Sequence, residues 1–148
     1  MSDTIVRFIP ADPYHRLDEA TRQRVVDYLK RTMKADIWDV QWQEKPFFVD
    51  CGGNLDVIKC PVCGETLDFR WWGDAMDASF EHEFSDLTVT LPCCNAVSSL
   101  NDLRYDFLCG FACEMVGLLN PPADPDAAVL AAVERLIGCP VHVIYAHY

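Results

Sequence analysis

Two pairs of cysteines constrain the fold of this chain more than any other feature. The first pair, Cys60 and Cys63, lies in the run C-P-V-C-G, and the second pair, Cys93 and Cys94, lies in L-P-C-C. Two thiolates separated by two residues converge on one metal ion, and a glycine after the second allows the tight turn around it. Four thiolates close a tetrahedral shell, so these cysteines predict a structural zinc ion, Zn2+, that joins two distant parts of the chain.

The second pair departs from the usual pattern because its two cysteines are adjacent. Sulfur atoms that share a tetrahedral zinc ion lie about 3.8 Å apart, whereas neighbouring side chains on an extended strand point to opposite faces. Both Cys93 and Cys94 can therefore bind the metal only if the backbone turns at Cys93, and the flanking proline and asparagine favour such a turn. If the turn fails, His82 or, less readily, Cys51 would replace one of the pair.

The sequence shows no signal for secretion or membrane insertion, and we infer the cellular compartment from this. No apolar stretch reaches the roughly 20 residues that a membrane-spanning helix needs, and residues 1–10 lack the basic and apolar regions of a secretory signal peptide. We therefore expect a cytoplasmic protein without a membrane partner, in which the eight cysteines bind metal or remain thiols. Cys109, Cys113 and Cys139 are interpreted as small buried core residues.

The net charge is −11, from 23 acidic and 12 basic residues. A negative field repels the phosphate backbone that supplies most non-specific affinity for nucleic acid. Between Cys60 and Cys94 the only basic residue is Arg70, so the predicted metal site lacks the cations of a nucleic-acid surface. We do not expect a nucleic-acid partner, and an acidic surface suits a basic protein partner instead.

The first third of the chain predicts a strand, a helix and a second strand. Residues 4–9 are a β-branched and apolar run that ends at a proline. In residues 17–33, apolar side chains recur mostly every three or four positions, between acidic residues at the start and basic residues at the end, which favours a helix. Residues 37–43 alternate in the manner of a half-buried strand. Three apolar side chains then share one face: Trp38, Val40 and Trp42.

The last third predicts a helix and a strand after one ambiguous segment. Residues 111–119 are an apolar run that suits either a strand or a helix. A helix is expected over residues 125–137, with Asp124 as its cap and a glycine just after its end. Residues 141–145 predict a final strand.

This order of elements predicts a single α+β domain over residues 1–148. The order strand-helix-strand occurs twice if residues 111–119 are extended, as in a ferredoxin-like split βαβ sheet. Residues 47–108 then form a zinc-bearing insertion between the second and third strands. If residues 111–119 are helical, the alternative is a three-stranded α+β layer.

The insertion itself predicts a short amphipathic helix and one strand. Met76, Phe80 and Phe84 recur every four residues, with acidic residues between them. We interpret these carboxylates as a solvated face, because nothing in the sequence sets two of them in contrasting environments for acid-base chemistry. Residues 87–91 alternate as a strand that leads into the second cysteine pair.

The chain has no catalytic signature. It lacks the phosphate-binding loops, the serine nucleophile motif and the paired-histidine motif of common enzyme classes. We therefore do not predict an enzyme. The alternative is a small enzyme with its site between sheet and insertion, which would use His142, His147, Asp102 or Arg104.

The insertion resembles zinc-ribbon proteins over the segment from Cys60 to Cys94. The wider chain looks like an uncharacterised family of small bacterial cytoplasmic zinc-ribbon proteins, on the segments T-I-V-R-F-I-P, S-L-N-D-L and the final A-H-Y. That resemblance implies no activity. From the charge and the aromatic residues we predict a protein-interaction module, an acidic adaptor or immunity-type binder of a basic protein. Its expected anchors are Trp71, Trp72, Tyr105 and Phe107.

Overall fold

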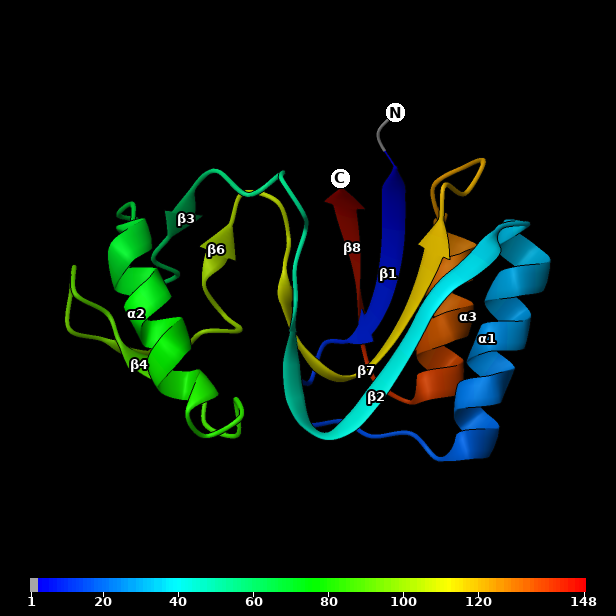
Figure 1. Cartoon of the computed structure of the whole chain (residues 1–148), viewed down its shortest axis with the longest axis horizontal. Helices are drawn as coiled ribbons and strands as arrows, with labels where there is room; N and C mark the ends of the chain where they lie inside the picture. Colours follow the sequence, from blue (N-terminus) through cyan, green and yellow to red (C-terminus); the bar gives the residue numbers. More distant parts are fainter. Residues whose placement is uncertain (1–2) are drawn as a thin grey trace.

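The computed structural model describes residues 3–148 as an α+β structure around one four-stranded antiparallel sheet (Figure 1). The strands lie in the order β2-β7-β1-β8, and every neighbouring pair is antiparallel. These strands are β1 (Thr4–Pro10), β2 (Asp36–Val49), β7 (Gly110–Leu119) and β8 (Val141–His147). Helices α1 (Glu19–Met33) and α3 (Ala127–Ile137) connect β1 to β2 and β7 to β8, and both cover the same face of the sheet.

Between β2 and β7 the chain leaves the sheet and forms an arm, residues 50–109, on the face opposite to α1 and α3 (Figure 1). The arm contains two small antiparallel pairs, β3 with β6 and β4 with β5, and one helix, α2. Its elements are β3 (Ile58–Lys59), α2 (Phe69–Phe80), β4 (Thr88–Thr90), β5 (Val97–Ser99) and β6 (Arg104–Tyr105). The division into a sheet and a separate subdomain over residues 47–108 stays a prediction.

Two apolar cores bury both faces of the sheet. On the helix side, Phe8 and Leu118 of the sheet pack with Leu29 of α1. On the arm side, Phe111 of the sheet packs with Leu91 of the arm. Every residue of β7 except the last is buried. A strand buried on both faces reads as a continuous apolar run without alternation, which is why the sequence of residues 111–119 did not distinguish strand from helix.

Each helix begins at an aspartate that caps its first turn. Asp18 precedes α1, and its carboxylate accepts a hydrogen bond of 2.7 Å from the Thr21 backbone N–H. The expected cap Asp124 of the last helix is wrong: Asp126 accepts a bond of 2.9 Å from the Val129 N–H. No helix among residues 3–148 is long and apolar enough to cross a membrane.

Two of the predicted periodicities are interrupted. The register of β2 against β7 shifts between Ile37 and Asp39, so Ile37 and Val40 both pack toward the helix-side core. The shift leaves Trp38 55% exposed and outside both cores. Helix α2 ends at Phe80, and Phe84 lies beyond it with a positive φ of 56°, so the spacing of four residues extends past the helix itself.

Candidate metal centre

The arm brings the four predicted cysteine sulfurs together. The Sγ atoms of Cys60 and Cys94 are 3.8 Å apart, those of Cys63 and Cys93 are 3.3 Å apart, and those of Cys93 and Cys94 are 3.9 Å apart. All four lie within 4.8 Å of one another. Four sulfurs around a tetrahedral zinc ion would be about 3.8 Å apart. The cluster therefore has the composition and size to hold a metal ion.

The first turn of the centre follows β3. The Gly64 backbone, with a φ of 79°, donates a hydrogen bond of 3.1 Å from its N–H to the Cys60 carbonyl. The N–H groups of Val62 and Cys63 each point at the Cys60 sulfur over 3.3 Å. These donors stabilise a thiolate at Cys60, and the left-handed glycine closes the turn.

The second turn, between β4 and β5, repeats the first. Asn95 has a φ of 60°, and its N–H donates to the Leu91 carbonyl over 2.9 Å. The Leu91 N–H donates to the Ala96 carbonyl over 2.9 Å, as the Cys60 N–H donates to the Glu65 carbonyl over 2.8 Å. Leu91 thus occupies the place of Cys60.

This repetition explains how adjacent cysteines can face one cluster. Cys94 takes the place that Cys63 has in the first turn, and Cys93 takes the place of Val62. The backbone turn that the sequence requires at Cys93 is therefore present. Its sequence signal is the similarity of L-P-C-C-N to C-P-V-C-G, which the spacing of the cysteines alone does not show.

The alternative ligands do not join the cluster. Among residues 3–148, the group of metal-capable side chains at this position contains the four cysteines and neither His82 nor Cys51. His82 lies in the turn after α2, where its N–H donates to the Ser79 carbonyl. Cys51 lies against Cys109 in the core between sheet and arm, and burial raises the pKa of its thiol.

The thiols of Cys60 and Cys93 differ in acidity. Burial opposes ionisation of Cys60, but the backbone N–H groups of Cys63 and Val62 outweigh it and lower its pKa to about 6. Desolvation and the neighbouring sulfurs of Cys63 and Cys60 raise the pKa of Cys93 to about 12. The Cys60 thiolate is therefore stable in the cluster alone, whereas Cys93 needs a bound cation before it ionises. The sulfur-bearing residues Cys63, Cys93 and Cys94 are exposed, so an ion can reach them.

The aromatic residues expected as anchors divide into two groups. Trp72 lies edge-on to Phe48 and Tyr105, and its Nε1–H donates to the Tyr105 hydroxyl over 3.2 Å. Tyr105 is buried, and its hydroxyl donates to the Leu100 carbonyl over 2.7 Å. The prediction that Tyr105 is displayed on the surface is therefore wrong, whereas Phe107 is exposed.

The residues of the enzyme alternative do not converge. His142 and His147 lie at opposite ends of β8, and the His147 Nδ1 is 3.0 Å from the Thr4 hydroxyl. Arg104 lies on the arm, in a hollow of about 320 Å³ that contains neither histidine nor Asp102. The residues that line it are Val57, Lys59, Arg104, Tyr105 and Asp106.

Comparison of the chain with protein-family models, with curated proteins and with solved structures finds no match. No relative therefore supplies a function for the cysteine cluster or for the surfaces around it.

Proposed function

We propose that the chain is a cytoplasmic protein-interaction module whose arm is held in shape by a structural zinc ion. The ion is bound by Cys60, Cys63, Cys93 and Cys94. The arm is a zinc ribbon inserted between the second and third strands of a ferredoxin-like split βαβ frame. Its partner is a basic protein, as for an acidic adaptor or an immunity-type binder.

The donor set supports zinc in a structural role. Four soft thiolate ligands in a compact cluster suit zinc, and a shell closed by four protein ligands leaves no position for a reacting water. None of the eight cysteines forms a disulfide, so all of them are compatible with a reducing compartment. The frame is supported by the strand order β2-β7-β1-β8, in which β1-α1-β2 and β7-α3-β8 are two interleaved βαβ units.

The proposed role of the metal is to hold helix α2 in place within the arm. The helix lies in sequence between the two cysteine pairs, and its only buried residue is Ser79. Its apolar contacts with the core come from partly buried side chains: Trp71, Trp72, Ala75 and Met76. A helix without a fully buried apolar side chain is weakly held by packing. A structural zinc ion contributes roughly 10–16 kcal/mol of apparent binding free energy in small domains. The metal therefore confines α2 by closing the loop that contains it.

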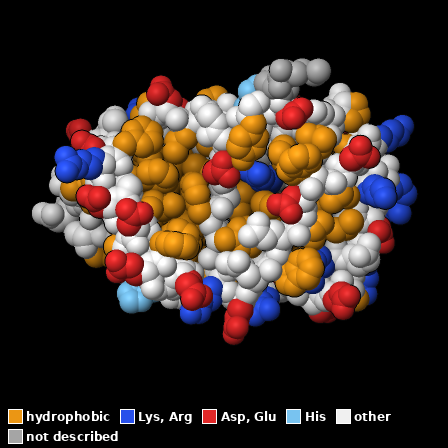
Figure 2. All heavy atoms as spheres, viewed as in Figure 1, with side chains coloured by type: hydrophobic (Ala, Val, Ile, Leu, Met, Phe, Trp, Pro, Cys, Tyr) orange, Lys and Arg blue, Asp and Glu red, His pale blue; other side chains and the backbone are white. Residues whose placement is uncertain are grey.

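The exposed face of α2 is the proposed contact surface. Phe69, Trp72, Met76 and Phe80 follow one another at spacings of three and four residues, which places them on one stripe of the helix. At the two ends of the stripe Phe69 is 44% exposed and Phe80 is 64% exposed, whereas Trp72 and Met76 between them are only partly exposed and also pack against the core. Figure 2 shows a patch of hydrophobic side chains on the arm. Such a contiguous apolar patch is typical of an interaction site.

The acidic residues around this stripe are the reason for proposing a basic partner. The 29 residues from Gly64 to Pro92 contain seven acidic residues and only Arg70 as a basic one, which is −6 of the total charge of −11. Five exposed acidic residues lie on α2 or at its two ends: Asp68, Asp74, Asp77, Glu81 and Glu83. An apolar stripe with an acidic rim favours the apolar face of a basic segment.

Site-specific photo-crosslinking in cells of the source organism tests this function. A photoreactive residue at Phe80 is expected to capture one protein of net positive charge. The same residue at Ala128, an exposed position on α3, is the matched control and is expected to capture none. Asp77→Asn with Glu81→Gln should lower the yield at Phe80, since these changes remove part of the acidic rim. An acidic captured protein, or equal capture from both positions, contradicts the proposal.

A further inference from the structure

The two edges of the four-stranded sheet differ in how they are covered. At the β8 edge, the segment of residues 51–54 bonds to the strand: Gly53 N–H donates to the His147 carbonyl over 3.0 Å, and the Asn54 side chain donates to the Tyr145 carbonyl over 3.1 Å. At the other edge, β2 is the last strand, and no described backbone segment pairs with its outer side. An open edge presents unpaired N–H and C=O groups that can accept another strand.

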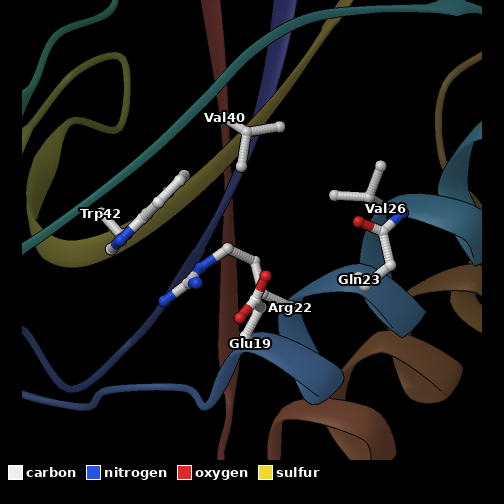
Figure 3. Close-up of a pocket in the computed structure, with 6 residues that line it drawn as sticks. All are labelled: Glu19, Arg22, Gln23, Val26, Val40 and Trp42. Carbon is white, nitrogen blue, oxygen red and sulfur yellow. The ribbon is translucent and has the colours of Figure 1, made fainter.

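A groove runs along this open edge, between β2 and α1. It has a volume of about 570 Å³. Figure 3 shows four side chains of α1 facing two of β2 across it. The lining residues are Glu19, Arg22, Gln23, Val26, Val40 and Trp42. The groove therefore places apolar and polar side chains next to unpaired backbone.

One wall of the groove is fixed by a buried ion pair. Glu114 of β7 is 3% exposed, and its carboxylate accepts hydrogen bonds of 2.9 Å and 2.8 Å from the Arg22 Nε and NH2 groups. The Arg22 guanidinium lies 4.3 Å from the centre of the Trp42 ring. Trp42 is directly opposite Glu114 in the sheet register. These contacts hold the indole in place while it stays 53% exposed.

The groove has a net negative charge, because the positive charge of Arg22 is neutralised by Glu114. Glu114 neutralises Arg22, which leaves the Glu19 carboxylate as the remaining charge of the lining. The exposed Trp42 indole and the Glu19 carboxylate line the same groove, and together they favour a cationic side chain, which gains both a charge contact and a cation–π contact. The apolar Val26 and Val40 suit an apolar side chain nearby.

We propose that the open edge of β2 binds an extended segment of a basic partner as an added fifth strand. A basic side chain of this segment lies on Trp42 beside Glu19, and an apolar one lies between Val26 and Val40. Strand addition takes affinity from main-chain hydrogen bonds and specificity from alternate side-chain pockets. The inference rests on the proposed function for the basic character of the partner. A second copy of this chain is disfavoured, because it carries the same net charge of −11.

The test uses the zinc-loaded full chain and a short, end-blocked peptide that alternates arginine and valine. By NMR, the peptide should slow exchange of those amides in residues 39–43 that do not bond to β7. Trp42→Ala should weaken binding about fivefold, as expected for loss of a cation–π contact. Trp38→Ala is the matched control, because Trp38 is an exposed tryptophan of the same strand outside the groove. It should change the affinity less than twofold.

Two further comparisons can overturn the inference. A peptide N-methylated at alternate residues cannot pair along the strand, so equal binding by that peptide rules out strand addition. Peptide-free sedimentation that shows a dimer assigns the edge to a second copy instead. Peptide shifts confined to α2 would remove the β2 site and leave the proposed function standing. If the peptide protects the β2 amides but Phe80 captures no protein, the α2 contact surface is wrong and the β2 site stands.

Discussion

Gly64 and Asn95 occupy the same place in two copies of one turn. Each has a positive φ, 79° and 60°, and each donates its N–H to the carbonyl of the residue four positions earlier. In the first copy that residue is Cys60, and in the second it is Leu91, which is fully buried in the core between sheet and arm. In the second turn the position equivalent to Cys60 is therefore used for packing by Leu91. The second sulfur of this turn comes from Cys93 instead.

The conformation of Asn95 should control metal affinity. Asn95→Val places a β-branched side chain in the left-handed region, which costs about 1–2 kcal/mol. A metal-free arm can relax this strain, so the cost falls on zinc binding and should weaken it roughly tenfold. Competition with a chromophoric chelator measures the change. Asn95→Gly is the control and should bind at least as tightly as the unchanged protein. Equal affinity of the valine variant would show that the turn does not limit binding.

Each cluster cysteine should be required for zinc. Replacement of Cys60, Cys63, Cys93 or Cys94 by serine removes one of four thiolates, and we expect each variant to lose its metal to a chelator that the unchanged protein withstands. Elemental analysis after chelator treatment gives the zinc content per chain. Cys139→Ser, a partly buried cysteine outside the cluster, should keep about one equivalent. Retention of zinc by Cys93→Ser alone would reduce the site to three protein ligands.

Metal removal should loosen the arm before the helix side of the sheet. Helix α2 buries only Ser79, whereas α1 buries Val25, Leu29 and Met33. After chelation, amide hydrogen exchange should rise strongly in α2 and change little in α1. Mass spectrometry of peptides from both helices measures this difference. An equal rise in both helices would mean that the metal stabilises the whole chain as one cooperative unit.

The sequence predicts the cysteine cluster well because its signal is local. A C-x-x-C-G turn is encoded in five residues, and the second turn is encoded in the same number. The identity of β7 and the face of Trp38 are not local properties. Residues 110–119 form a buried strand because the arm covers the face of the sheet opposite to the helices. The exposure of Trp38 depends on a register shift of β2 against β7. The groove at Trp42 was missed for the same reason, although Glu114 inside an apolar run signals a buried ion-pair partner.

Gly52 should be essential at the entry to the arm, while its neighbour Gly53 should not. A Cβ atom on Gly52 would lie 2.3 Å from the His147 carbonyl oxygen, and its φ is 65°. Gly53→Ala meets nothing closer than 3.8 Å. Left-handed strain and overpacking together should destabilise Gly52→Ala by about 3 kcal/mol. Urea unfolding of both zinc-loaded variants measures the difference. A cost below about 1 kcal/mol for Gly52→Ala would mean that the segment moves away from β8 without loss.

Replacing only Glu114 of the Arg22–Glu114 ion pair should lower the free energy of unfolding more than replacing both residues. The Arg22 and Glu114 side chains are 12% and 4% exposed, so Glu114→Gln leaves an uncompensated charge with little access to water. We expect this variant to lose about 3 kcal/mol of unfolding free energy. Replacement of both residues by apolar side chains, Arg22→Met with Glu114→Leu, should lose less than the single change, because no buried charge remains. Urea unfolding of Arg22→Met, of Glu114→Leu and of the double variant gives the coupling energy directly. Simple addition of the two single effects would mean that the Leu17 N–H bond to Glu114, of 3.0 Å, dominates over the charge contact.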